Sequence, residues 1–356
     1  MSNEKRRDSG IELLRIVLCF FVILIHTRIS AYYDEHKLLD SIAKTVWFLS
    51  NSCFFIISGY YALSSKKLLE EDGVKKFYLK KISTIVLPLV IYSVLYVIID
   101  YSSAGEQIIS RSFFTDYITR LLSNKISFHM WFMYSLLGRM LAVPLLVFAF
   151  KYMPPKSCNI IFVIATVLLQ LKVLLSDFNI SLGIDFILGG WLLIFCIGWF
   201  AENRIDAKNE KWLYIAGILG FIITVPALCY LPQYKNATDF ALPHILFSLS
   251  VFVLFKRHVN IKGKIIGRII SFVSKYTFSI YLVHIAVIRS LPSKYLPKGI
   301  DNAIVNHLVK SFIFFIVSFV IAIIVDNIVI RPLKYLAVKL FKFLSNIILK
   351  SRKVIS

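Results

Sequence analysis

The sequence predicts an all-α protein, a polytopic transmembrane helical bundle of about ten spans with both termini in the cytoplasm. Hydrophobic residues make up 58% of the 356 residues, and the mean hydropathy is +0.74. A soluble helical protein needs a polar outer face and is less apolar than this. Apolar runs of the length that crosses a bilayer recur along the chain, and basic residues gather in alternate connections between them.

An apolar helix needs roughly 20 residues to cross the hydrocarbon core. The runs that meet or approach this length, some of them interrupted, are residues 11–30, 42–63, 82–101, 128–150, 158–176, 185–201, 212–231, 241–255, 269–290 and 304–330. The run at 241–255 is short, so it either starts earlier, tilts, or is partly buried by neighbouring helices.

Basic residues distinguish the two sides of the predicted bundle, because cytoplasmic loops favour Lys and Arg. Most of them fall in the N-terminal segment, every second connection and the C-terminal segment: Lys5, Arg6, Arg7, Lys66, Lys67, Lys75, Lys76, Lys80, Lys81, Lys151, Lys156, Arg204, Lys208, Lys211, Lys256, Arg257, Lys262, Lys264, Arg268 and the stretch from Arg331. This alternation predicts cytoplasmic termini. The first apolar run has no small-residue cleavage site after it, which predicts a retained first span.

The net charge of +21 suggests a nucleic-acid binder at first sight. The basic residues lie in short loops and not on one soluble face, so we expect no nucleic-acid partner. Residues 1–330 are predicted to form the transmembrane domain, and residues 331–356 a basic amphipathic tail lying on an anionic inner leaflet. The five cysteines fall within or beside apolar runs without metal-ligand spacing, so neither disulfides nor a metal site is expected.

Charged groups inside a span are costly and are therefore functional candidates. The first span contains Glu12, Arg15 and His26. An α-helix places Arg15 and His26 on one face, about three turns and roughly 16 Å apart, with an offset of about 20°. Glu12 lies one turn from Arg15 and could pair with it.

Several motifs, in order along the chain, resemble those of the acyltransferase-3 family of membrane acyltransferases. Arg15 and His26, with ten residues between them, resemble the signature of that family in its first span. Further segments agree: the run from Phe54 to Tyr60, a basic loop leading to Pro88, His129 with Trp131 before Pro144, and Ser279-Ile-Tyr281-Leu282-Val-His284. Lys81 and Thr84 stand where the family often carries Arg-x-x-Arg, and Glu12 replaces the commoner Asp.

The resemblance implies transfer of an acyl group, usually acetyl, from cytoplasmic acyl-CoA to a hydroxyl of an envelope sugar or lipid-linked carbohydrate. Acyl-CoA would be a co-substrate, with no bound cofactor. A sugar hydroxyl is a poor nucleophile, and an imidazole has a pKa suited to taking its proton. His26 is the expected general base or, alternatively, an acyl-carrying nucleophile, while Arg15 engages the donor or holds the geometry with Glu12.

Donor contacts are expected from Lys80 and Lys81; the alternative is that these residues only orient the third span. Donor contacts are also expected from Ser58 and Tyr60, for which helix packing is the alternative. Acceptor contacts are expected from four residues: His129, Trp131, Tyr281 and His284. Trp131 is more typical of a membrane-interface belt. His284 could be a second proton-handling group, and Asp326 could pair with a basic neighbour.

A transporter or exporter of a glycan or lipid precursor is the alternative function, since ten spans with buried charges also describe carriers. That alternative predicts inverted repeats, and the sequence shows no internal repeat. It also contains no GxSxG, HExxH, P-loop or GxGxxG motif.

Overall fold

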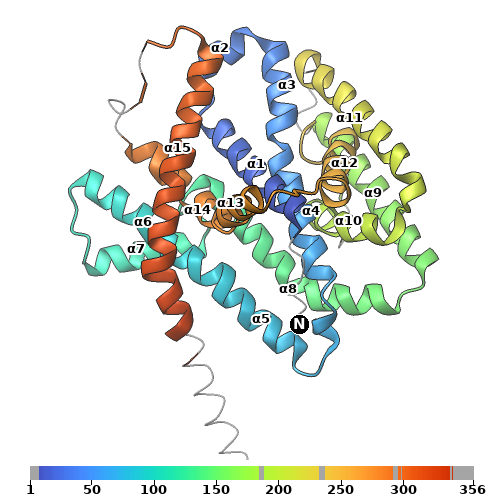
Figure 1. Ribbon diagram of the computed structural model, residues 1–356, viewed down its shortest axis with the longest axis horizontal. Coiled ribbons are helices and arrows are strands. Elements are labelled where there is room, and N and C mark those ends of the chain that lie inside the picture. Colours follow the sequence, from blue (N-terminus) through green and yellow to red (C-terminus); the bar gives the residue numbers. More distant parts are fainter. Residues whose placement is uncertain are drawn as a thin grey trace, which may run out of the picture.

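The computed structural model describes residues 8–183, 188–231, 237–291, 296–297, 299–336 and 339. Over these residues the regular structure is helical, with no strand, which confirms the predicted all-α class (Figure 1). The principal helices are α1 (Ser9–His26), α3 (Lys37–Trp47), α4 (Leu49–Leu63), α5 (Gly73–Lys81), α6 (Leu87–Ala104), α7 (Arg111–Leu122), α8 (Trp131–Tyr152), α9 (Pro155–Asp177), α10 (Trp191–Arg204), α11 (Glu210–Tyr230), α12 (Leu242–Arg257), α13 (Lys264–Ser274), α14 (Thr277–Ser290) and α15 (Ala303–Val325).

Shorter elements join or extend these helices. They are the helix α2 (Ser30–Glu35), the 3₁₀ turns η1 (Lys66–Leu69), η3 (Phe128–Met130) and η4 (Ala207–Asn209), and the π-helical turns η2 (Ile82–Val86) and η6 (Asp326–Ile330). Turn η2 links α5 to α6 in one continuous helical stretch, and η6 follows α15 in the same way.

Seven helical stretches of the described chain are long and apolar enough to cross a membrane: Ser9–His26, Lys37–Leu63, Gly73–Ala104, Phe128–Tyr152, Pro155–Asp177, Ala207–Tyr230 and Ala303–Leu336. Helices α13 and α14 form an eighth candidate as a pair bent by 57°. These spans support the predicted multi-pass membrane architecture.

The described residues do not confirm the predicted count of about ten spans, because two of the predicted runs form helices too short to qualify by length. Helix α10, in the run 185–201, has 14 residues, and α12, in the run 241–255, has 16. At 1.5 Å per residue they are about 21 and 24 Å long, less than the roughly 30 Å hydrocarbon core. Both bury much of their length, α10 against α4 and α12 against α11. The cytoplasmic placement of the termini stays a prediction.

Close approach of α4 and α10 depends on two glycines. A Cβ added to Gly59 would lie 1.6 Å from the carbonyl oxygen of Phe195, and one added to Gly198 would lie 2.7 Å from that of Ile56. Each glycine therefore faces the backbone of the other helix, the contact that small residues permit in membrane bundles.

Helix α1 contacts α3, α4, α12, α13, α14 and α15, so it lies inside the bundle. Its apolar residues Leu14, Leu18 and Ile23 are buried. Near its C-terminal end, the Oγ1 of Thr27 and the Nε2 of His307 on α15 lie 3.2 Å apart. The first helix is therefore held by both apolar packing and polar contacts.

The segment before α12 is attached to two helices. The Nδ2 of Asn51 on α4 donates to Asp239 over 3.1 Å, and the Nε2 of Gln170 on α9 donates to the carbonyl of Phe240 over 3.0 Å. Burial raises the pKa of Asp239 to about 6, although the hydrogen bond from Asn51 acts in the opposite direction.

The predicted tail lies almost wholly outside the described residues. Its first part, Arg331 to Leu336, continues the helix that begins with α15, so the chain shows no break at residue 330. The basic N-terminal residues Lys5, Arg6 and Arg7 also lie outside the described residues.

Candidate functional site

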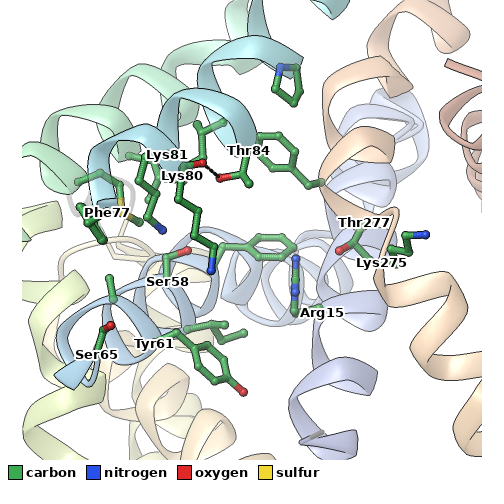
Figure 2. A pocket seen from close by; sticks show the side chains of 18 of the residues that line it. Arg15, Ser58, Tyr61, Ser65, Phe77, Lys80, Lys81, Thr84, Lys275 and Thr277 are labelled. Atoms are coloured by element: carbon green, nitrogen blue, oxygen red, sulfur yellow. Dashed lines mark hydrogen bonds between the residues drawn. The ribbon is translucent and has the colours of Figure 1, made fainter. Parts of the chain in front are cut away.

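A cavity of about 830 Å³ lies between α1, α4, α5, η2, α8, α14 and η6. Figure 2 shows Arg15, Ser58, Tyr61, Lys80 and Lys81 around this space, with side chains contributed by α1, α4 and α5. Both π-helical turns contribute to its wall, through Thr84 and Ile85 of η2 and through Asp326 and Ile330 of η6. Such turns are frequent at functional sites.

Basic side chains dominate the charged lining. They are Arg15, Lys67, Lys76, Lys80, Lys81, Lys275 and Lys334, against the two acids Glu70 and Asp326. Phe54, Phe77 and Phe132 supply apolar wall, and the ammonium group of Lys81 lies 5.2 Å from the centre of the Phe77 ring. A cavity with this lining suits a ligand that has both an anionic part and an apolar part.

The expected donor-contact residues divide between the cavity and its surroundings. Ser58, Lys80 and Lys81 line the cavity. The expected Tyr60 does not line it, and the adjacent Tyr61 lines it instead. The ring of Tyr60 lies 5.7 Å from that of Phe252 and 5.4 Å from the ammonium group of Lys256. A helix turns about 100° per residue, so only one of two adjacent tyrosines can face the cavity.

Asp326 is held in the cavity wall by hydroxyl groups. Its carboxylate accepts hydrogen bonds from Ser279 at 2.8 Å and from Tyr92 at 3.1 Å. The sequence suggested a basic partner for this acid: its hydrogen bonds in the described chain come from these hydroxyls, and Lys334 and Arg331 interact with it electrostatically. The hydrogen bonds from Ser279 and Tyr92 fix the Asp326 carboxylate in the wall of the basic cavity, where it is an acceptor.

Arg15 and Glu12 both lie in the first half of α1. Arg15 lines the cavity, while Glu12 accepts a hydrogen bond from the Oγ of Ser271 on α13 over 3.3 Å. The acid therefore connects the start of α1 to the bent helix pair.

Three histidines from distant parts of the sequence meet at the other end of α1. The ring centre of His26 lies 5.3 Å from that of His284 on α14, and His284 lies 5.0 Å from His129 on η3. Phe128 contacts His26 at 5.2 Å, and Tyr281 contacts His284 at 5.7 Å. Tyr281 also lines the cavity, so it is in contact with both the cavity and the histidine cluster. His26 is partly exposed, while His129 and His284 are buried.

Both ring nitrogens of His129 have partners within the protein. The hydroxyl of Tyr96 donates its proton to the carbonyl of Leu282 over 2.9 Å, so it can only accept from His129 Nε2 at 3.4 Å. The other nitrogen, Nδ1, then accepts from the hydroxyl of Ser127 at 2.9 Å. Both ring nitrogens of His129, one of the expected acceptor contacts, are therefore occupied within the protein, and its hydrogen bond to Tyr96 holds η3 to α6.

Trp131, another expected acceptor contact, packs among aromatic side chains. Its ring centre lies 5.4 Å from Trp191, 6.0 Å from Phe132 and 6.4 Å from Phe55. Trp131 does not itself line the cavity, although its neighbour Phe132 does, and within the described chain its ring contacts none of the three histidines. This aromatic cluster connects α8 to α4 and α10.

Several site residues were not singled out from the sequence, notably Tyr61, Tyr96, Lys76 and Lys275. Tyr61 had a usable signal, because it follows Ser58 by three residues and shares its helix face. Lys275 also had a signal, as a charge inside the predicted run 269–290, whereas Tyr96 had none, since it reaches the site only through the packing of α6.

Residues 8–327 match the sequence profile described as an acyltransferase domain, that of the acyltransferase-3 family. The chain belongs to the acyltransferase-3 family. This agrees with the resemblance seen in its motifs, and the acyltransferase-3 chain is thus a multi-pass membrane enzyme that transfers acyl groups other than aminoacyl groups. A similar protein is YfiQ of Bacillus subtilis (strain 168), named provisionally as a membrane-bound acyltransferase. It is 23% identical over 295 residues, which cover 76% of this chain and 78% of YfiQ. No solved structure matches the chain.

Proposed function

We propose that this acyltransferase-3 enzyme transfers an acyl group, expected to be acetyl, from cytoplasmic acyl-CoA to a hydroxyl of an extracytoplasmic or lipid-linked polysaccharide. One observation carries the proposal. Helix α1 contributes Arg15 to the basic cavity and His26 to the histidine cluster beyond it. A single helix therefore connects a site suited to an anionic donor with a partly exposed base.

The cavity supports the assignment of the donor. Acyl-CoA combines several phosphate oxygens with a long, uncharged pantetheine arm. Lys and Arg bind phosphate oxygens well, and Lys76, Lys80 and Lys81 lie together on α5 at one side of the cavity. The arm would extend along Phe54 and Phe132 toward Tyr281, beyond which lie the histidines.

The partial exposure of His26 supports the assignment of the acceptor. His284 and His129 are buried, so His26 is the histidine of this cluster that an acceptor hydroxyl can reach directly. Phe128 beside it is 66% exposed and offers an apolar surface for one face of a sugar ring.

In the proposed reaction, the acceptor oxygen attacks the thioester carbonyl while His26 takes the hydroxyl proton. A carbon–oxygen bond forms, and the carbon–sulfur bond breaks as the intermediate collapses. The proton then passes from His26 to the leaving thiolate, which gives the O-acyl product and free CoA with no other reactant consumed.

Transfer is tested with purified protein in detergent or liposomes, radiolabelled acetyl-CoA and envelope polysaccharide or its lipid-linked precursor. We expect label in the glycan, removed by mild alkali because the bond is an ester, and free CoA in equal amount. His26→Ala should abolish both while remaining membrane-inserted.

Two results would contradict the proposal. The first is normal acylation by His26→Ala. The second is movement of an unmodified glycan or lipid across the liposome membrane with no consumption of acyl-CoA, which would favour a transporter.

A further inference from the structure

His284 has one ring nitrogen that is buried without a hydrogen-bond partner. The side chain is completely buried, and its Nδ1 lies 2.7 Å from the carbonyl oxygen of Tyr281. A carbonyl only accepts, so Nδ1 carries the proton and Nε2 of the neutral ring is an acceptor. This Nε2 has no partner among the described residues. An unsatisfied buried acceptor is costly and calls for an explanation.

The polar rings around His284 include one candidate donor. In the described part of the chain, three polar rings have centres within 6 Å of that of His284, namely those of His26, His129 and Tyr281. Both nitrogens of His129 are engaged, and the hydroxyl of Tyr281 donates to the carbonyl of His129. Among the described residues, His26 makes no hydrogen bond through its ring, so it retains an N–H to offer.

We propose that His284 is a positioning residue for His26, accepting an N–H of the His26 ring as that ring takes up the proton of the acceptor hydroxyl. The inference rests on the proposed function, in which His26 is the base. The ring centres of His26 and His284 lie 5.3 Å apart, a separation at which an N–H of one imidazole can reach a nitrogen of the other.

The chemistry of two facing imidazoles explains why this pairing would help. A His26 ring whose N–H is directed at His284 presents its other nitrogen, the one with the lone pair, to the acceptor. When His26 becomes an imidazolium, its N–H is a stronger donor, so the hydrogen bond to His284 strengthens in the transition state. His284 gains and loses no proton, and the balance of the transfer reaction is unchanged.

The titratable groups around the pair come from every element packed on it. They are His129 on η3, Tyr96 on α6, Tyr281 on α14, His307 on α15 beside Thr27, and Arg28, which follows α1 and is paired with Asp34 and Asp40. None of these side chains donates to His284 Nε2. A change in the titration of His26 on replacing His284 therefore reports the loss of this acceptor.

The test compares His284→Gln, which keeps an acceptor oxygen near the Nε2 position, with His284→Leu, which fills similar volume without one. Carbethoxylation of His26 by diethylpyrocarbonate is followed by mass spectrometry from pH 5 to 9 in purified protein, with the exposed His36 as an internal control. We expect the midpoint of His26 reactivity to fall by about one pH unit in His284→Leu and to stay near the wild-type value in His284→Gln. Transfer by His284→Leu should fall in kcat by about 100-fold, with little change in KM.

An unchanged His26 midpoint in a folded His284→Leu protein overturns the inference, regardless of the rate of acyl transfer by that variant. The midpoint is measured without substrates, so it tests the pairing even where no acceptor is acylated. Full transfer by His26→Ala would instead overturn the proposed function. A thermal-unfolding scan of both His284 variants identifies a protein that has lost its fold. If His284→Leu has lost its fold, the His26 midpoint is compared between His284→Gln and the wild type.

Discussion

Arg15 and His26 lie on the same helix, α1, with Arg15 in the wall of the basic cavity and His26 beside the ring of His284. Their separation along the helix is roughly 16 Å, comparable to an extended pantetheine arm. This relationship gives the two residues different expected roles, one in donor binding and one in chemistry.

Replacing His26 by Ala should lower kcat by at least about 100-fold, because proton removal from the hydroxyl would lack its base. The KM for the donor should change little, since His26 does not line the cavity. Steady-state kinetics with purified protein measure both values. His36→Ala, at an exposed position stacked on Tyr32, is the matched control and should behave as wild type.

Replacing Arg15 by Gln should raise the KM for acyl-CoA by about 10- to 100-fold, as expected for loss of a charge-assisted contact. Lys81→Gln should act in the same direction and weaken the salt dependence of KM. Lys156→Gln, at an exposed position on α9, is the control. Unaltered donor KM values in both cavity variants would exclude the cavity as the donor site.

Tyr60 and Tyr61 provide a paired test of the cavity. Tyr61→Ala should raise the donor KM, because this side chain lines the cavity. Tyr60→Ala should leave the donor KM near wild type and lower thermal stability, because its ring packs on Phe252. The reverse pattern of KM values would show that the donor binds elsewhere.

Gly59→Ala should destabilise the protein by about 1–3 kcal/mol or more, the cost of overpacking a tight contact. The new methyl group would meet the carbonyl oxygen of Phe195 and push α4 from α10. Gly138→Ala on α8 is a matched control, since nothing lies within 4 Å of its added Cβ, and it should be neutral or stabilising. Equal unfolding temperatures for the two variants in detergent would contradict this account.

Stability should depend on pH through Asp239, whose pKa is raised to about 6, chiefly by burial, from an ordinary value of 3.8. The folded protein binds this proton more tightly than the unfolded chain, so stability falls as pH rises between these two values and then stays level. Asp239→Asn should unfold about 2 °C or more above wild type at pH 7.5 and match it near pH 4.

Thermal scans from pH 4 to 8 measure this difference. Asp301→Asn, at an exposed position before α15, should shift the unfolding temperature little at any pH. A constant difference between wild type and Asp239→Asn across the range would show that the carboxyl proton is not its cause.

Much of the helical architecture and the family membership could be inferred from sequence because they depend on local patterns. Apolar runs predict helices whatever they pack against, and the Arg15–His26 spacing places both residues on one face through helix geometry alone. By contrast, Ser58, Lys80 and Lys81 were grouped as donor contacts only through the family resemblance, since nothing local connects α4 to α5.

Which runs form helices long enough to cross a membrane, and which side chains meet, became clear only from the tertiary structure. The run at 241–255 is apolar whether it faces lipid or packs on α11, so the sequence alone did not show that α12 has only 16 residues and packs closely on α11. Likewise, the meeting of His26 with His284 and the full use of His129 require α1, α14, η3 and α6 to converge. Helix periodicity specifies the face on which a side chain lies, but the neighbour of that face depends on close contacts such as that between Gly59 and Phe195.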